Sequence, residues 1–322
     1  MTSIERIELA EIEAARARIA GSALRTPLIP LNVDDAPARI WLKLENLQPI
    51  GSFKIRGAGN AVLSATREEL AAGLVTTSTG NMAQGIAWMA RELGVPATVI
   101  APHNSSPGKL AAVERLGGRV INVTWDEWWA AMEAGGMEGV DGTFVHPVRD
   151  ERVMAGNGTI GLELAEDLDE IDAVVIPWGG GGLTTGIASA LAALRPETRI
   201  VVVEPETGAP VAAAVANGRV PVPVEYTPSF IDGAGSGGLL PDMWERAEPL
   251  VSDAFAIPLA EAADAVRLLA ERARIVAEGA AGLAVAAALA GHAGPGRVVC
   301  IVCGGNIDPA RLAAILGGRV PD

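Results

Sequence analysis

One lysine in this sequence has unusual neighbours for a charged residue. Lys54 lies in the octapeptide Gly-Ser-Phe-Lys-Ile-Arg-Gly-Ala at 51–58, directly between Phe53 and Ile55. A lysine in apolar surroundings is partly neutral near pH 7, and its neutral amine can form a Schiff base with an aldehyde. A lysine that snorkels from the start of a helix would give the same octapeptide. The octapeptide alone favours this structural interpretation, so the choice depends on other parts of the chain.

A run of four glycines is the second unusual feature. Gly179, Gly180, Gly181 and Gly182 follow a strand-like segment and precede a helix-like one. Each glycine costs roughly 1 kcal/mol relative to alanine at the start of a helix, so a run of four is unfavourable as a plain turn. Glycines allow close approach of the backbone, and N–H groups at a helix N-terminus bind phosphate. The run predicts a phosphate site, although the residues after it do not complete a Walker loop.

Two further turns follow strand-like segments. Ser78-Thr79-Gly80-Asn81 combines two hydroxyls and an amide before a helix-like run, where a plain N-cap would need one such residue. This set is suited to a carboxylate. Cys303 ends an apolar segment, either as a small buried hydrophobic residue or as a weak S–H donor to a ring nitrogen. Ligands gather at the carboxyl ends of strands in open α/β sheets, so these turns can converge on one site.

Alternating strands and helices must position these turns. Apolar runs predict strands at 40–44, 74–77, 97–101, 120–123, 143–146, 173–177, 199–204 and 297–302. Periodic segments predict helices at 4–20, 61–72, 82–93, 108–116, 126–132, 156–168, 183–194, 260–273 and 279–289. The helix at 156–168 is expected to start after a Gly-Asn-Gly turn, and 208–258 is expected to be less regular. The alternation predicts an α/β fold with mostly parallel sheets, helices on both faces and two lobes.

Composition excludes several classes of function. The chain has 322 residues and a formal net charge of −14, which argues against nucleic acid or an anionic membrane surface as a partner. Its N-terminus has no signal-peptide pattern, and its Ala-rich stretches are too short to span a bilayer. The two cysteines, Cys300 and Cys303, are poorly placed for a disulfide with each other. A cytoplasmic protein with a small-molecule ligand is expected.

The segments GSFKIRGA, STGN, PWGGGGL and CGGN, in this order, resemble the fold-type II pyridoxal-phosphate enzymes. Within that group the chain is similar to the threonine/serine dehydratases (ammonia-lyases) and serine racemases, from about Arg25 to Asp308. The resemblance implies two open, twisted sheets flanked by helices, with the active site in the cleft between domains. Residues 1–50 and 146–322 would form a large cofactor-binding domain, and 51–145 a small domain that closes over the substrate. It also implies a homodimer.

The resemblance assigns roles toward pyridoxal 5′-phosphate (PLP). Lys54 would hold the cofactor as a Schiff base and move the Cα proton, and Phe53 would pack against the ring. Asn81 would bond the ring 3′-oxygen, and Gly179 to Gly182 with Leu183 would hold the phosphate. Cys303 would face the pyridine nitrogen. A thiol stabilises a pyridinium less than a carboxylate does, so the ring would stay closer to neutral, which favours elimination.

The substrate would bind at 78–82, where the sequence departs from the family pattern. The resemblance places the substrate carboxylate on Ser78, Thr79, Gly80 and Asn81. Met82 stands where histidine usually follows, and Thr79 stands where racemases carry serine. Met82, together with Trp125, Trp128 and Trp129, motivates the hypothesis of a bulky or aryl β-substituent. The three tryptophans share one helix face, so a core or packing role is their default.

No metal site is expected. The racemase branch requires an acidic residue six positions after a strand-end glutamate. Glu204 occupies the strand end, but Pro210 occupies the second position. Glu204 is therefore the single candidate ligand.

The sequence predicts a PLP-dependent ammonia-lyase that converts a β-hydroxy-α-amino acid, of the L-threonine or L-serine type, to a 2-oxo acid and ammonia. One alternative is an amino-acid racemase with Thr79 as the acid/base on the face opposite Lys54; the extra methyl group of threonine restricts its rotamers there. A second alternative is a non-catalytic phosphate- or nucleotide-binding protein with the same sheet.

Overall fold

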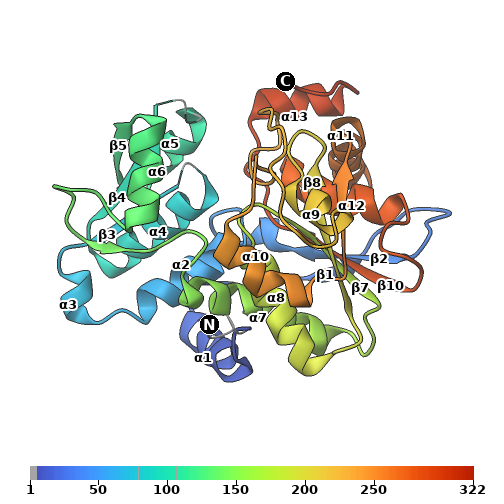
Figure 1. Ribbon diagram of the computed structural model, residues 1–322, viewed down its shortest axis with the longest axis horizontal. Coiled ribbons are helices and arrows are strands. Elements are labelled where there is room, and N and C mark those ends of the chain that lie inside the picture. The colour runs from blue at the N-terminus through green and yellow to red at the C-terminus, as the bar shows by residue number, and fades with distance from the viewer. Residues whose placement is uncertain (1–5, 79, 104, 106) are drawn as a thin grey trace. The chain divides into compact units, whose positions relative to one another are not determined.

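The chain forms two compact units (Figure 1). The computed structural model describes residues 6–78, 80–103, 105 and 107–322. The larger unit consists of Met1–Leu9, Arg25–Leu47 and Gly158–Asp322, and the smaller unit of Ala10–Leu24 and Gln48–Asn157. The smaller unit includes 10–24 and 146–157, which the sequence analysis assigns to the large domain. The domain boundaries expected from the sequence stay a prediction.

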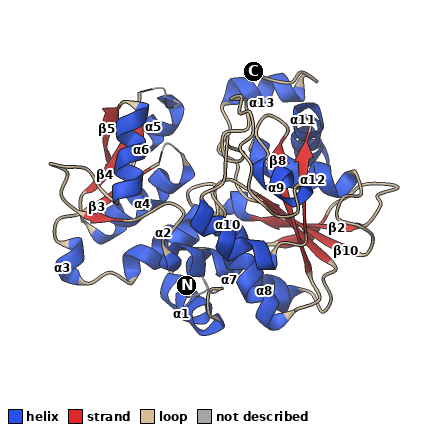
Figure 2. Cartoon of the chain, viewed as in Figure 1, coloured by secondary structure: helices blue, strands red, loops and turns tan. Residues whose placement is uncertain are grey.

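The larger unit contains a six-stranded sheet in the order β1-β2-β10-β7-β8-β9. Figure 2 shows strands in red, with β2, β8 and β10 of this sheet labelled. Its strands are β1 Leu28–Pro30, β2 Arg39–Leu44, β7 Ala173–Pro177, β8 Arg199–Pro205, β9 Asp253–Ile257 and β10 Arg297–Val302. β1 pairs antiparallel with β2, and the other neighbours are parallel. β7 is buried along its whole length, which explains why it reads as a continuous apolar run rather than an alternating one.

Helices of the larger unit cover this sheet and position its turns. They are α8 Gly182–Leu194, α9 Pro210–Ala216, α10 Pro241–Ala247, α11 Leu259–Leu268, α12 Gly279–Leu289 and α13 Pro309–Leu316. The chain is helical over the expected range 260–273, but α11 passes into a π-helical turn, Leu269–Ala273, for the last part of it. α12 packs on β7, β8, β10 and α11, so its Ala-rich surface is buried almost all round. No helix in the described part of the chain is long and apolar enough to cross a membrane.

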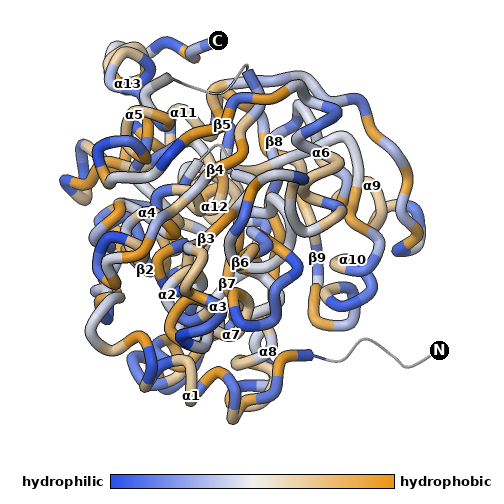
Figure 3. The backbone as a smooth tube through the Cα atoms, turned by 90° about the vertical axis from the view of Figure 1, so that its left-hand side faces the viewer, coloured by the Kyte–Doolittle hydropathy of each residue, from blue (hydrophilic) through white to orange (hydrophobic). Residues whose placement is uncertain are grey.

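The smaller unit contains a parallel four-stranded sheet in the order β5-β4-β3-β6. Its strands are β3 Leu74–Thr77, β4 Ala97–Pro102, β5 Arg119–Val123 and β6 Thr143–Phe144. The helices are α1 Leu9–Ile19, α2 Lys54–Leu63, α3 Arg67–Leu70, α4 Asn81–Leu93, α5 Pro107–Arg115 and α6 Trp125–Ala134, and α7 Glu151–Asp167 begins here and ends in the larger unit. Figure 3 shows how hydrophobic segments such as β4 alternate with polar ones along the chain. The predicted α/β class with two mostly parallel sheets is confirmed.

Two helices start earlier than the sequence indicates, and glycines explain both errors. α2 begins at Lys54 rather than at 61, and α7 begins at Glu151, before the Gly-Asn-Gly segment. A Cβ on Gly156 would lie 2.3 Å from the carbonyl oxygen of Arg56, and one on Gly57 would lie 2.7 Å from Val153. These glycines are therefore contact points between two helices and not turns.

Candidate active site

Lys54 is the first residue of α2 and follows a tight turn in the smaller unit. Gly51 has a φ of 69°, which glycine adopts without strain, and Ser52 and Phe53 lead from it into the helix. Lys54 Nζ lies 5.0 Å from the centroid of the Phe53 ring and donates a hydrogen bond to the carbonyl oxygen of Pro147 at 3.4 Å. The structure thus brings Phe53 and Lys54 together and holds the half-buried amine against an aromatic ring.

The turn at 78–81 connects β3 to the N-terminus of α4. Ser78 Oγ accepts a hydrogen bond from the Gly80 N–H at 3.3 Å, and Asn81 is the first residue of the helix. The N-cap of α4 is Gly80, which has no side chain of its own, so the positive end of a 13-residue helix meets this turn. Thr79, the predicted racemase acid/base and a predicted substrate contact, lies outside the described residues. The described part of the turn retains the features that suit a carboxylate.

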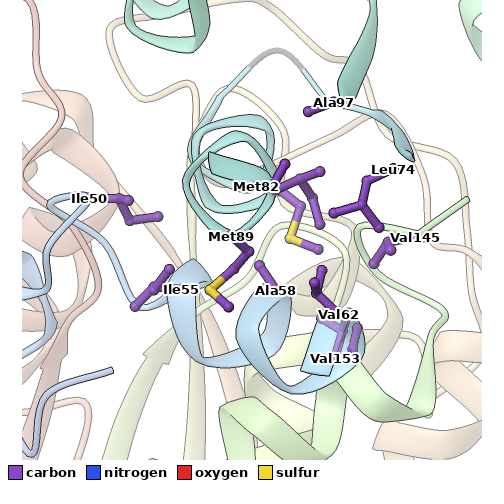
Figure 4. Packing of buried hydrophobic residues seen from close by; sticks show 13 residues of the cluster. Ile50, Ile55, Ala58, Val62, Leu74, Met82, Met89, Ala97, Val145 and Val153 are labelled. Atoms are coloured by element: carbon purple, nitrogen blue, oxygen red, sulfur yellow. The ribbon is translucent and has the colours of Figure 1, made fainter. Parts of the chain in front are cut away.

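The side chain of Met82 packs in the core of the smaller unit. It is 1% exposed and lies in a cluster with Ala58 and Val62 of α2 and Leu74 of β3 (Figure 4). The hypothesis that its side chain makes a substrate pocket more apolar is therefore not supported, because the core already occupies that side chain. Only the backbone N–H of Met82, in the first turn of α4, can serve an anion.

The tryptophan cluster on α6 is largely exposed. Trp128 packs against Val75 and Ile100 of the sheet, as its default role predicts. Trp125 and Trp129 are 57% and 42% exposed, so a core role is wrong for these two, but their ring centroids lie 4.8 and 6.3 Å from that of Trp128, which agrees with a packing role. The three tryptophans lie on one face of α6, but only part of that face contacts the sheet. Of the three, Trp128 is the one that lies on this part.

Lys109 is a residue near the 78–81 turn that sequence reasoning missed. A Cβ built on Gly80 would lie 3.8 Å from Lys109 Nζ. The ammonium group of Lys109, a residue of α5, therefore lies close to the backbone of the turn. Lys109 stands in the first turn of its own helix, where the helix dipole disfavours a cation. That position was a usable signal, because a lysine at the unfavourable end of a helix indicates an anion nearby. The turn therefore has a positive charge beside it.

The four glycines join β7 to α8 in the larger unit. Gly181 has a φ of 92° and is the N-cap of α8, with no side-chain cap. A Cβ on Gly179 would lie 3.0 Å from the carbonyl oxygen of Gly233. Thr184 and Thr185, in the first turn of the helix, are fully buried, and their hydroxyls have no hydrogen-bond partner among the described residues. A phosphate bound at this helix N-terminus would supply the partners that these hydroxyls need.

Cys303 directly follows β10 and lies next to a buried carboxyl group that sequence reasoning missed. Its Sγ is 3.6 Å from Glu278 Oε1, and the two residues are 3% and 4% exposed. Glu278 is the N-cap of α12, a position where shorter polar residues are preferred, and its side chain does not cap its own helix. Cys300, in contrast, donates to the carbonyl oxygen of Ala284, and burial raises the pKa of its thiol well above the usual range. Cys303 thus contacts a carboxyl group, whereas Cys300 contacts a backbone carbonyl.

The polar groups of the larger unit fit PLP. The backbone at Gly233 lies next to Gly179 on one side. On its other side lies Glu278, since a Cβ on Gly233 would be 3.6 Å from Glu278 Oε1. The glycine run and the Cys303–Glu278 pair are therefore both neighbours of Gly233. The N-terminus of α8 and the hydroxyls of Thr184 and Thr185 suit a phosphate. The thiol of Cys303 suits a ring nitrogen. PLP carries both groups on one ring.

Glu204, at the end of β8, caps α9. Its Oε2 accepts hydrogen bonds from the N–H groups of Val211 and Ala212, at 2.9 and 3.0 Å. Burial raises the pKa of this carboxyl group to about 8, and the two backbone hydrogen bonds only partly offset that effect. A carboxyl group that keeps its proton near neutral pH is a poor cation ligand, and the described residues contain no group of three or more His, Cys, Asp or Glu side chains that could hold a metal.

We expect Glu204→Gln to flatten the pH dependence of stability. The folded state binds the Glu204 proton up to pH of about 8, whereas the unfolded state releases it near its ordinary value of 4.5. The free energy of unfolding of the wild type should therefore fall by about 1.4 kcal/mol for each pH unit within this window, and glutamine removes this loss. Thermal unfolding at pH 5, 7 and 8.5 measures the difference, with the exposed Glu206→Gln as the matched control. Parallel pH profiles for wild type and Glu204→Gln would contradict the assignment.

Comparisons with known proteins identify the family. A family model described as pyridoxal-phosphate dependent enzyme matches residues 19–304. An L-threonine ammonia-lyase from Thermotoga maritima is 38% identical over 316 residues, which cover 96% of this chain and 78% of the relative. Maize serine racemase has a TM-score of 0.87 at 30% identity and covers 96% of both chains. The processed form of threonine deaminase isoform 2 from Solanum lycopersicum has a TM-score of 0.86 at 29% identity, covering 96% of this chain and 92% of that one. The chain therefore belongs to the family of pyridoxal-phosphate dependent enzymes.

Proposed function

We propose that this protein is a PLP-dependent ammonia-lyase that converts L-threonine, and L-serine as a second substrate, to a 2-oxo acid and ammonia. The observation that carries the proposal is the position of Lys54, whose amine lies against the Phe53 ring at the start of α2 in a chain that belongs to a PLP-dependent family. The relative named L-threonine ammonia-lyase matches nearly the whole chain and supports this choice of reaction. Family membership indicates an enzyme rather than a non-catalytic binding protein.

Lys54 has two tasks in this proposal. Its Nζ would hold the cofactor, and the free amine would remove the proton from the substrate Cα. Bound PLP supplies an electron sink for the negative charge that develops at Cα. Loss of the β-hydroxyl group as water, followed by hydrolysis, gives the 2-oxo acid and ammonia.

The remaining predicted site residues orient the reactants. Gly179 to Gly182, with the backbone of Leu183 and the hydroxyls of Thr184 and Thr185, bind the phosphate. Asn81 would bond the ring 3′-oxygen of the cofactor. Ser78, Gly80 and the first turn of α4 bind the substrate carboxylate, helped by the charge of Lys109. The Met82 side chain is part of the core, so it gives no reason to prefer an aryl analogue over threonine or serine.

We expect Lys109→Met to weaken substrate binding more than turnover. Removing a cation near the carboxylate should raise KM for threonine about tenfold, equivalent to about 1.4 kcal/mol, with a smaller change in kcat. Initial-rate kinetics of 2-oxo acid formation separate the two constants. Lys109→Arg keeps the charge and serves as the control, with KM near the wild-type value. Equal KM values for Lys109→Met and wild type would show that Lys109 does not assist the carboxylate.

Borohydride labelling combined with a substrate assay tests the proposal. The chain has only three lysines, Lys43, Lys54 and Lys109. Lys43 is fully buried and ion-paired with Glu163 at 2.6 Å. Reduction of the holoenzyme, digestion and mass spectrometry should find the phosphopyridoxyl group on Lys54, and the unreduced enzyme should release ammonia from L-threonine. Label on another lysine, or labelled Lys54 without ammonia release, would refute the proposal.

Racemisation is the second candidate function, because a solved serine racemase shares the fold of this chain over 96% of its length. In that case Thr79 would act on the face of the substrate opposite Lys54. Chiral chromatography after incubation with L-serine decides between the two, since D-serine in excess over pyruvate is the racemase result.

The assembly and location of the protein also belong to this proposal. We infer a cytoplasmic homodimer from the resemblance to the family. Light scattering coupled to size exclusion measures the oligomeric state.

A further inference from the structure

We propose that His146 is a positioning residue for Lys54, because its imidazole closes the turn whose Pro147 carbonyl group holds the lysine amine. The inference rests on the proposed function, in which that amine takes the Cα proton of the substrate. All residues in the argument lie in the smaller unit, within Gln48–Asn157. The Phe53 ring also contacts the amine, but a ring face attracts a cation without fixing the direction of its N–H groups.

The imidazole of His146 caps the turn at 147–149. Its Nδ1 accepts hydrogen bonds from the N–H groups of Val148 at 3.0 Å and Arg149 at 2.8 Å. A backbone N–H can only donate, so Nδ1 presents a lone pair and the ring proton lies on Nε2. Asparagine and aspartate cap turns and helix starts with the same two donors, two and three residues ahead. His146 therefore acts as a cap of this kind, with a ring nitrogen in place of an oxygen.

The turn is anchored at both ends. The carbonyl oxygen of Val145, directly before it, accepts a hydrogen bond from the hydroxyl of the buried Thr76 of β3 at 2.9 Å. Arg149, its last residue, forms an ion pair with Glu133 of α6 at 2.9 Å. Pro147 is buried between them, and its ring fixes its own φ. The backbone at Pro147 therefore has little freedom to move.

The capped peptide group directs its carbonyl oxygen to Lys54. The carbonyl of Pro147 and the N–H of Val148 belong to one planar, trans peptide group, so they point in opposite directions. Because the N–H points to His146 Nδ1, the oxygen points away from the imidazole, and Lys54 Nζ donates to it at 3.4 Å. Rotation of this peptide group would break both hydrogen bonds. His146 and Lys54 are thus coupled through one rigid group.

The carbonyl group of Pro147 orients the amine for proton transfer. An amine that donates one N–H to a fixed oxygen keeps its lone pair in directions away from that oxygen, and proton transfer depends strongly on such alignment. Once the amine of Lys54 has taken the Cα proton it is an ammonium, and the fixed carbonyl dipole stabilises its charge. The turn therefore serves the proton transfer rather than the binding of the substrate.

Two amides that differ by one methylene group test the inference. Asparagine places its oxygen at the position of His146 Nδ1, whereas glutamine carries it one carbon further out. We expect His146→Gln to lower kcat for ammonia release at least about tenfold with KM for threonine changed less than about twofold, and His146→Asn to have nearly the wild-type kcat. Thr66→Ala removes the side-chain cap of α3 in the same unit and should leave kcat unchanged. A fully active His146→Gln, or a His146→Asn as slow as it, overturns the proposal.

A second readout needs neither cofactor nor substrate. Acetic anhydride acetylates accessible amines, and mass spectrometry of the digested apoprotein compares the rate at Lys54 with that at Lys109 as an internal reference. Lys54 should react at least about threefold faster in His146→Gln than in the wild type and His146→Asn, because its amine no longer donates to a fixed carbonyl oxygen. Equal rates in the three proteins count against the inference.

The inference and the proposed function fail separately. A wild type that releases no ammonia from L-threonine refutes the proposed function, whereas the acetylation rates of the apoprotein do not depend on that reaction. If His146→Gln does not fold, ¹⁵N NMR of the wild-type histidines and the kcat of His146→Asn decide. The proton of His146 is expected on Nε2, and a proton on Nδ1, or a tenfold loss of kcat in His146→Asn, overturns the inference.

Discussion

Replacing Lys54 with alanine is expected to reduce ammonia release from threonine at least about a thousandfold, because one amine both holds the cofactor and moves the Cα proton. Alanine leaves α2 intact, since it is the best helix former and position 54 is the first residue of the helix. The folded variant should therefore show the wild-type thermal midpoint within a few degrees. Coupled assay of the 2-oxo acid measures the rate.

Lys54→Arg separates the chemistry of the amine from its charge. Arginine keeps the cation near the Phe53 ring but stays protonated, so it neither bonds to the aldehyde nor accepts a proton. Its activity should be as low as that of the alanine variant, and borohydride should label no lysine in either protein. An arginine variant with more than a tenth of the wild-type rate would show that Lys54 serves only as a charge.

Replacing Gly181 with alanine is expected to weaken cofactor binding at least about tenfold. The residue has a φ of 92°, and a Cβ there would lie 2.6 Å from the ring of Trp178. The left-handed conformation alone costs a non-glycine residue about 1–2 kcal/mol, and Trp178 is buried and cannot withdraw freely. The backbone before α8 must shift, which misaligns the N–H groups that bind phosphate. Titration of the apoprotein with PLP, followed by absorbance, measures the dissociation constant.

Gly218→Ala is the matched control for this variant. Gly218 also lies in the larger unit, has a φ of 67°, and a Cβ there would meet nothing within 4 Å. It carries the conformational cost without the collision, so its thermal midpoint should fall slightly while its affinity for PLP stays at the wild-type value. If both variants bind PLP equally well, the glycine run does not hold the phosphate.

The sequence predicts the fold and the positions of the glycine- and hydroxyl-rich turns well, for physical reasons. Strands buried on both faces, such as β7, read as short apolar runs, and glycine marks the turns that follow them. Glycines within α2 and α7 mislead the same reasoning, because a glycine required by close packing looks like one required by a turn. α9, α10 and β9 were not predicted, since short elements in a Pro- and Gly-rich region leave little periodic signal.

Long-range contacts explain what the sequence did not predict at the candidate site. Glu278 is 25 positions from Cys303, and Lys109 is 29 from Gly80, so no local pattern joins the members of either pair. Met82 illustrates the opposite error. Its place after the 78–81 turn indicated a pocket, but the first turn of a helix has one face on the core, and Met82 lies on that face.

The contact between α2 and α7 limits how this enzyme could evolve. Gly57 and Gly156 have room for hydrogen alone as a side chain, because a larger one would collide with Val153 or with the backbone at Arg56. Single substitutions at these glycines therefore cannot shift α2, which carries Lys54, by small amounts. The close contact between α2 and α7 keeps the position of the Lys54 amine constant as the sequence changes. New substrate preferences would have to arise in segments outside this contact, such as the 78–81 turn and Lys109.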